Sequence, residues 1–215
     1  AEANALNLAR LSFEGDVIVE RAKPTLRMGR AIVSPPPGAF LQPTALGEET
    51  LARLTVEALQ GSKRVVDLFS GIGTFALRLA EHAEVLAAEG DAEMLVALKK
   101  ASDGAGGALK EITTMRRDLL RTPLSTLEMK KFDAAVIDPP RSGARLQAEQ
   151  IARSPVRARR SRRSSMAPCG TCNWKACATA MTSAPDHPTT PRAPERALSA
   201  CAYSAMYLRA APCHE

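Results

Sequence analysis

The stretch that decides the fold of this 215-residue chain is Asp67-Leu68-Phe69-Ser70-Gly71-Ile72-Gly73-Thr74. Its first residues complete a short apolar run, Arg64 to Phe69, of the kind that forms a buried strand. Gly71 and Gly73 then let the backbone turn tightly and approach a ligand closely. A helix is expected over residues 74–82, so the stretch predicts a strand, a glycine turn and a helix in succession.

Strand and helix patterns continue to alternate after this unit. Further strands are expected at 84–88, 111–115 and 132–137, and further helices at 92–101 and 144–153. Such alternation predicts an α/β fold, a Rossmann-like parallel sheet with helices on its faces. Ligands of these sheets bind at the carboxyl ends of the strands, so the residues that follow each strand are the candidate site.

The first 45 residues indicate strands and loops instead of this alternation. Short β-branched runs occupy 16–20 and 30–33, and Pro35-Pro36-Pro37-Gly38 then excludes regular structure. An extended segment, Ala39 to Gln42, leads to a helix expected over 48–60. The sequence thus predicts three parts, which are a lead-in segment at 1–45, an α/β domain at 46–156 and a tail at 157–215.

An acidic residue closes the second strand at a distance that suits a nucleoside ligand. Glu89 lies sixteen residues after Gly73, where its carboxylate can accept hydrogen bonds from both hydroxyls of a ribose. Position 76 is Ala, so the third glycine of a dinucleotide-binding turn is absent. The pattern favours a cofactor without pyrophosphate, such as S-adenosylmethionine. The alternative is a tightly packed glycine turn with no ligand.

Two further aspartates follow strands. Asp118 comes after the third strand, where an acid can contact the amino group of an adenine, although a solvated loop acid is the alternative. Asp138-Pro139-Pro140-Arg141 ends the fourth strand. Its two prolines stiffen the backbone and remove two amide donors, which suits a carboxylate held beside a reacting group. A plain strand terminator is the other interpretation.

These segments together resemble the uracil-5 RNA methyltransferase family, whose members make 5-methyluridine in bacterial 23S rRNA and in tRNA. The resemblance runs from about Leu8 to Pro155 and rests on Phe40-Leu41-Gln42, on 67–75, on Glu89-Gly90 and on 138–144. The turn at Asp138 is its most specific part, because amino-group methylases usually carry an aromatic residue where Arg141 stands.

The resemblance implies a class I methyltransferase sheet, S-adenosylmethionine as the methyl donor and rRNA or tRNA as the substrate. It places six side chains around the cofactor and the target base, beside the backbone of Gly71 and Gly73. They are Gln42, Phe69, Thr74, Glu89, Asp118 and Asp138.

Family members also need a nucleophile, because carbon 5 of uracil reacts poorly until a cysteine thiolate adds to carbon 6. That cysteine would be expected some twenty-six residues after Asp138, where this chain has Ser164 in an arginine-rich stretch with no apolar strand before it. Thr171-Cys172-Asn173 is similar to the family's cysteine segment but comes eight residues later. Cys172 is therefore a weak candidate nucleophile, and no catalytic residue is assigned.

The tail differs in composition from the body. Residues 157–215 carry nine basic and three acidic side chains, which is the whole net charge of +6, and all five cysteines. They contain no Val, Ile or Phe. The favoured interpretation is that the tail is disordered and that the sheet before it lacks its C-terminal strands. A shifted reading frame or a fusion would explain the abrupt change of composition near residue 157.

Two other interpretations of the tail remain open. Cys169, Cys172 and Cys177 with His187 have the residue types of a zinc site, although the spacing is irregular and no metal is assigned. The five arginines between positions 157 and 163 could instead bind phosphates.

The function expected from the sequence is S-adenosylmethionine-dependent methylation of carbon 5 of uridine, in a truncated or altered form without its nucleophile. The alternatives are a non-catalytic RNA-binding fragment that uses the arginine-rich arm and, less favoured, a methyltransferase for another base or a protein side chain. No apolar run approaches the roughly 20 residues of a membrane span. A cytoplasmic monomer is expected.

Overall fold

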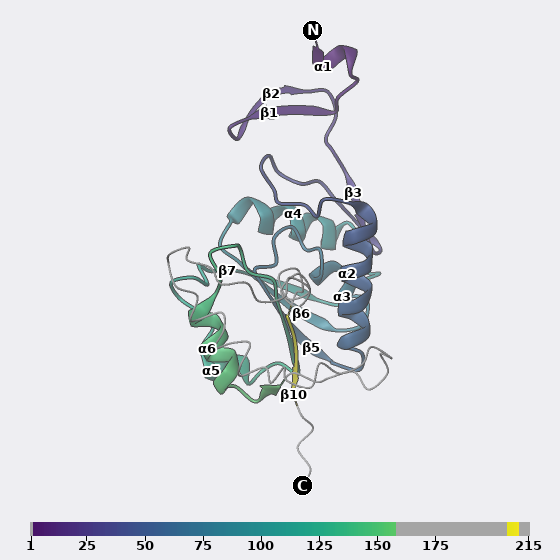
Figure 1. The fold of residues 1–215 in the computed structure, drawn as a ribbon. Helices are drawn as coiled ribbons and strands as arrows, with labels where there is room; N and C mark the ends of the chain where they lie inside the picture. Colours follow the sequence, from purple (N-terminus) through teal and green to yellow (C-terminus); the bar gives the residue numbers. More distant parts are fainter. Residues whose placement is uncertain (1, 158–205, 211–215) are drawn as a thin grey trace, which may run out of the picture.

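The computed structural model describes residues 2–157 and 206–210, and Figure 1 shows a central sheet with helices around it. The sheet order is β7-β6-β5-β8-β10-β9. Its first four strands are parallel, as expected. Their bounds lie within two residues of the sequence expectation, and they are β5 (Arg64–Leu68), β6 (Glu84–Glu89), β7 (Ile112–Arg116) and β8 (Ala134–Ile137).

The sheet continues beyond β8 through two strands that periodicity did not predict. β10 (Met206–Ala210) runs antiparallel to β8, with Met206 opposite Ile137, and β9 (Val156–Arg157) runs antiparallel to β10. The sheet is therefore mixed, and the edge of β8 is paired by a short segment of the tail. The rest of the predicted disordered tail, 158–205 and 211–215, lies outside the described residues.

Three helices cover one face of the sheet. They are α2 (Ala45–Ala58), α3 (Ala76–Leu79) and α4 (Ala92–Asp103). α2 begins at an N-cap, Thr44, whose hydroxyl accepts the N–H of Gly47, and α4 begins at Asp91, whose carboxylate accepts the N–H of Glu93. Val65 of β5 and Leu98 of α4 are buried in the core cluster beneath these helices.

The helix expected over 74–82 is regular only in α3. The glycine turn delays its start, since the N–H of Gly73 bonds back to the carbonyl of Ser70. A turn follows α3, closed by the N–H of His82 on the carbonyl of Leu79. The backbone of the turns on either side therefore makes α3 shorter than its apolar pattern predicts.

The opposite face of the sheet is covered by α5 (Thr126–Met129) and α6 (Arg145–Arg153), which lie together on the other side of the sheet from α2 in Figure 1. Val66 alternates with Val65 along β5 and enters this second core, with Met129 and Ile151. α5 was not predicted, because four residues are too few to show helical periodicity.

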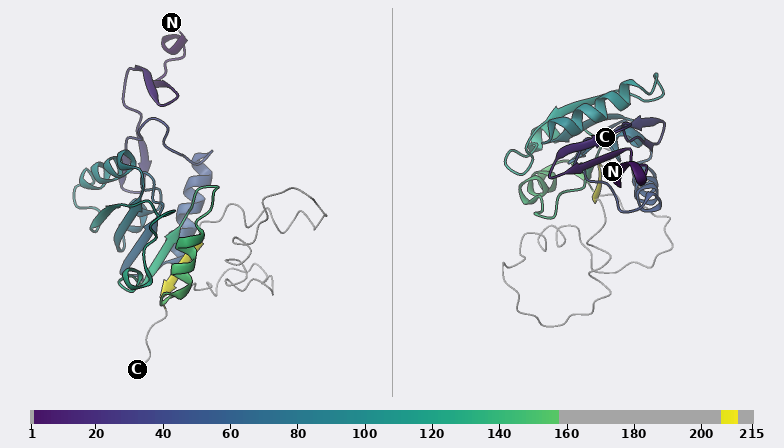
Figure 2. Two further views of the ribbon diagram at one scale, coloured as in Figure 1. Left: turned by 90° about the vertical axis from the view of Figure 1, so that its left-hand side faces the viewer. Right: turned by 90° about the horizontal axis from the view of Figure 1, so that it is seen from above.

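Two hairpins precede the sheet. β3 (Leu26–Met28) and β4 (Ala31–Val33) pair antiparallel and bury Met28, Ala31 and Val33 in the first core. α1 (Glu2–Ala5), β1 (Arg10–Phe13) and β2 (Asp16–Glu20) stand away from the body in Figures 1 and 2. The part of the chain that the structure describes has no helix long and apolar enough to cross a membrane. The division into three parts stays a prediction.

Candidate functional site

The glycine turn after β5 holds an unusual backbone. Phe69, Gly71 and Gly73 all have positive φ angles, of 64°, 54° and 98°. A positive φ at a residue other than glycine costs about 1–3 kcal/mol, so the strain at Phe69 needs support from its surroundings. The N–H groups of Phe69 and Ser70 both donate to the carbonyl oxygen of Ala88, at 2.9 and 3.2 Å. The turn is therefore fixed to the end of β6.

Glu89 lies at the carboxyl end of β6 and bonds to this turn directly. Its Oε2 accepts the N–H of Gly71 at 3.0 Å. Its Oε1 accepts the N–H groups of Gly90 and Asp91 at 2.7 and 3.1 Å. An ionised carboxylate has about four lone-pair sites, so about one remains for a ligand. The expectation that Glu89 accepts both ribose hydroxyls would require one of these amides to release it.

Asp67 is a buried acid beneath the turn, and its role was not recognised from the sequence. Its side chain is fully buried on the face of β5 that carries Val65. Neither carboxylate oxygen meets hydrogen-bond geometry with a donor among the described residues. Burial raises the pKa of Asp67 to about 8; the charge of Asp138 adds to this, the backbone N–H of Ala76 opposes it and the charge of Glu89 adds a smaller part.

Asp138 follows β8, beside the end of β5, where its N–H donates to the carbonyl of Leu68 at 3.4 Å. Burial raises the pKa of this carboxyl as well. Pro139 and Pro140 follow, and a hydrogen bond from the N–H of Gly143 to the carbonyl of Pro140, at 2.8 Å, closes the turn. The structure thus places Asp138 and Glu89 close enough to Asp67 for their charges to raise its pKa.

Asp118 lies in the loop after β7, and its side chain is 51% exposed. It accepts the N–H groups of Leu120 and Arg121, at 3.0 and 3.3 Å. Its Cα would lie 3.9 Å from a Cβ built on Gly90, so this loop adjoins the Glu89 segment. Asp118 is therefore at the same edge of the sheet as Glu89, with a carboxylate partly used by its own loop.

Arg117 stabilises the Asp118 loop. Its guanidinium donates to the carbonyls of Thr122 and Pro123 and to Oε1 of Glu128, at 2.7, 3.0 and 2.6 Å. These contacts join the loop to α5. The hydrogen bond from Arg117, followed by that from the backbone of Ser125, lowers the pKa of Glu128 to about 2.

The remaining expected site residues, Gln42 and Thr74, are both half-buried. No hydrogen bond of the Gln42 side chain is observed within the described residues. The carbonyl of Thr74 accepts Nη1 of Arg78 at 3.0 Å. Arg78 was missed by the sequence reasoning, and its only signal was a charge between two apolar residues of a short helix.

Cys172, the weak candidate nucleophile, and the cysteines and histidine of the possible zinc site lie outside the described residues. Residues 2–157 contain no cysteine. Within the described part, no group of three or more His, Cys, Asp or Glu side chains is arranged to hold a metal ion.

Comparison with known proteins identifies the relatives of this chain. An uncharacterized RNA methyltransferase of Rhizobium meliloti is 47% identical over 150 residues, which cover 70% of this chain and 36% of that relative. The 23S rRNA (uracil(1939)-C(5))-methyltransferase RlmD of Pseudomonas fluorescens is 39% identical over 121 residues, covering 54% of this chain and 26% of that relative. By sequence, this part of the chain is homologous to RNA methyltransferases, one of which is a 23S rRNA uracil-5 enzyme.

The fold of this chain is also found in a solved structure. A Pyrococcus abyssi tRNA (uracil-54, C5)-methyltransferase, solved with S-adenosyl-L-homocysteine, matches with a TM-score of 0.54 at 19% identity, over 65% of this chain and 34% of that one. No protein-family model matches the chain. The chain spans about a third of the length of the curated RNA methyltransferases it matches.

Proposed function

We propose that this chain binds S-adenosylmethionine at the glycine turn and derives from an enzyme that methylates carbon 5 of uridine in rRNA or tRNA. The observation that carries the proposal is the bond between Glu89 and Gly71, which places a carboxylate with a remaining lone pair over a turn of positive φ. The relatives named above support the family and the substrate class.

The residues present fit this cofactor. Glu89 would hold a ribose hydroxyl, and Asp118 would receive the adenine amino group through a lone pair that its loop leaves free. Asp67 and Ser70 have buried oxygens without hydrogen-bond geometry to a described donor, so the floor of the site can accept further hydrogen bonds. Glu89 and Asp138 are the carboxylates that would favour a cationic ligand, since Asp67, with a pKa of about 8, is mostly neutral near pH 7. The cofactor supplies an electrophilic methyl group on a positively charged sulfur when bound.

The uracil-5 step needs more than this site holds. No thiol is present between residues 2 and 157, so nothing in this body can add to carbon 6 of a uracil. Asp138 would face the target base from a stiff turn, as the family resemblance implies. We therefore propose that residues 2–157 bind the methyl donor and do not themselves supply the nucleophile for turnover.

Cofactor binding is tested by calorimetric titration of the full chain with S-adenosylmethionine. Glu89→Gln weakens the acceptor and is expected to raise the Kd about 10- to 100-fold, the range for one hydrogen bond to a charged group. Glu93→Gln is the control, because Glu93 is an exposed acid in the first turn of α4. Equal affinity of wild type and Glu89→Gln would contradict the proposed site.

Turnover is tested by incubating the full chain with methyl-labelled S-adenosylmethionine and total rRNA and tRNA. Binding without transfer is expected. Label on carbon 5 of uridine that disappears in Cys172→Ser would instead show that the tail supplies the nucleophile. RNA retention on filters without any cofactor binding would favour the non-catalytic RNA-binding fragment.

A further inference from the structure

Arg78 of α3 is a charged residue inside the body of the fold. Its side chain is only 9% exposed, and its neighbours Leu77 and Leu79 are buried in the apolar core. A buried guanidinium costs free energy unless its N–H groups find acceptors and its charge finds a partner. The partners of Arg78 therefore show which parts of the fold this charge holds together.

The guanidinium joins the glycine turn to helix α2. Nη1 donates to the carbonyl of Thr74 at 3.0 Å. Nη2 donates to Oε1 of Glu48 at 2.8 Å and to Oε2 of Glu49 at 3.2 Å. The side chain of Glu48 is 14% exposed and that of Glu49 is 68% exposed, so water screens the second pair far more than the first. The bond to Glu48 carries most of this link.

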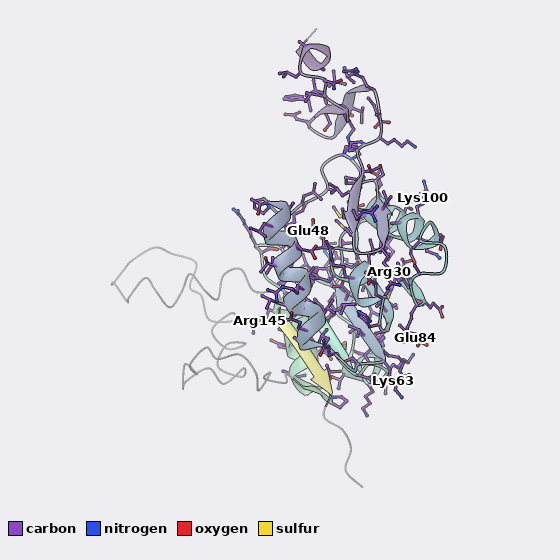
Figure 3. All side chains as sticks on the ribbon, turned by 90° about the vertical axis from the view of Figure 1, so that its right-hand side faces the viewer. Arg30, Glu48, Lys63, Glu84, Lys100 and Arg145 are labelled. Carbon is purple, nitrogen blue, oxygen red and sulfur yellow. The ribbon has the colours of Figure 1, made fainter. Side chains whose placement is uncertain are left out.

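Glu48 lies close in the chain to Gln42, one of the residues that the family resemblance places around the cofactor and the target base. It is in the first turn of α2, near the end of the helix where Figure 3 labels it. Its N–H donates to the carbonyl of the N-cap Thr44 at 3.0 Å. Only Pro43, with its fixed φ, separates Thr44 from Gln42. The connection from the glycine turn to Gln42 therefore runs through Arg78, Glu48 and the N-cap of α2, and few of its torsions are free to rotate.

We propose that Arg78 is a positioning residue that holds the Phe40–Gln42 segment in register with the glycine turn. A ligand on the turn and Gln42, which the resemblance places around the cofactor and the target base, would then keep one geometry relative to each other. This inference rests on the proposed function for the identity of the two ligands, but the tether between the two segments does not depend on it. Ordering the turn with a ligand should therefore also order the segment that carries Gln42.

The test is amide hydrogen exchange of the full chain, with and without S-adenosylmethionine. In wild type, the cofactor is expected to slow exchange over residues 40–50 by about fivefold or more, a typical coupling. Arg78→Met should abolish this slowing while the cofactor still protects residues 69–75. Arg78→Lys keeps the charge, so it should retain part of the slowing over residues 40–50. Arg53→Met is the control, since Arg53 of α2 pairs with Glu57 at an exposed position of that helix.

Glu48→Gln provides a second route that leaves Arg78 in place. It removes the stronger charge partner with little change of shape, so it should also abolish the slowing over residues 40–50. Unchanged slowing in a folded Arg78→Met, or in Glu48→Gln if Arg78→Met fails to fold, would overturn the proposal. If wild type binds no S-adenosylmethionine, the proposed function fails, and exchange of the ligand-free proteins decides the tether. Exchange over residues 40–50 that is faster than wild type in Arg78→Met and Glu48→Gln, but not in Arg53→Met, supports the tether. Rates equal to wild type in Arg78→Met and Glu48→Gln overturn it.

Discussion

Gly73 is the residue at which the turn, the first core and the site depend on one another most closely. A Cβ built there would lie 2.9 Å from Cγ of Leu98 and 3.1 Å from Cγ of Leu77, and the φ angle is +98°. Both neighbours are buried, so neither can move aside freely. Absence of a side chain at this position thus lets α4 pack closely under the turn that Glu89 closes.

Gly73→Ala is expected to destabilise the fold by about 2–4 kcal/mol, from overpacking and from backbone strain together. Urea unfolding followed by circular dichroism measures this change. Gly106→Ala is the matched control, because Gly106 also has a positive φ, of 61°, but no atom within 4 Å of the added Cβ. An equal loss in the two variants would show that backbone strain alone accounts for the effect at Gly73.

Some residues of the site follow from the sequence and others do not. Gly71, Gly73 and Glu89 lie at strand ends, where α/β topology alone brings residues to one edge. Arg78 was not predicted as a functional residue, and Asp67 was predicted only as part of the strand, because the importance of both comes from burial inside the fold. This property leaves no periodic trace in the sequence.

At the scale of elements, α6 clamps the loop that carries Asp118. Gln147 is fully buried. Its Oε1 accepts the N–H of Leu124 at 2.7 Å and its Nε2 donates to the carbonyl of Leu124 at 3.3 Å. Leu124 is itself buried, so both of its backbone groups depend on this one amide. Because α6 directly follows the turn after Asp138, the clamp joins two sides of the site.

The elements themselves were largely predictable where they are long. β5, β6, β7, β8, α2, α4 and α6 follow apolar patterns of four or more residues. α5 begins at a capping box, Ser125 with Glu128, which was present in the sequence as a local signal. β9 and β10 depend on backbone pairing across the sheet, which no local pattern encodes.

Gln147→Leu should destabilise the protein by about 2–4 kcal/mol, because it leaves a buried N–H and a buried carbonyl without partners. Thermal and urea unfolding measure the loss. Gln150→Leu is the comparison within α6, since Gln150 bonds to the N–H of Thr126 at 3.0 Å but is only half-buried, so water can replace it. A loss at Gln147 no larger than that at Gln150 would count against the clamp.

At the scale of the whole molecule, two carboxyl groups with shifted pKa values, Asp67 and Glu128, are expected to make folding depend on pH. Asp67 has a pKa of about 8 in the folded protein and 3.8 as its ordinary value. The folded state therefore binds a proton that the unfolded state loses, so this contribution to stability is complete below about pH 4 and falls as pH rises towards 8. Glu128 behaves in the opposite sense, because its pKa is lowered to about 2 and its contribution is lost only in stronger acid.

Asp67→Asn removes the titrating group and should flatten this dependence. Urea unfolding at pH 5 and at pH 7.5 is the measurement, and wild type is expected to be less stable at pH 7.5. The difference between the two pH values should shrink in Asp67→Asn and persist in Glu128→Gln, whose titration lies outside the window. A cationic ligand in the site should reduce the same difference in wild type, since a positive charge near Asp67 favours its ionised form. Equal pH dependence in wild type and Asp67→Asn would place the titrating group elsewhere.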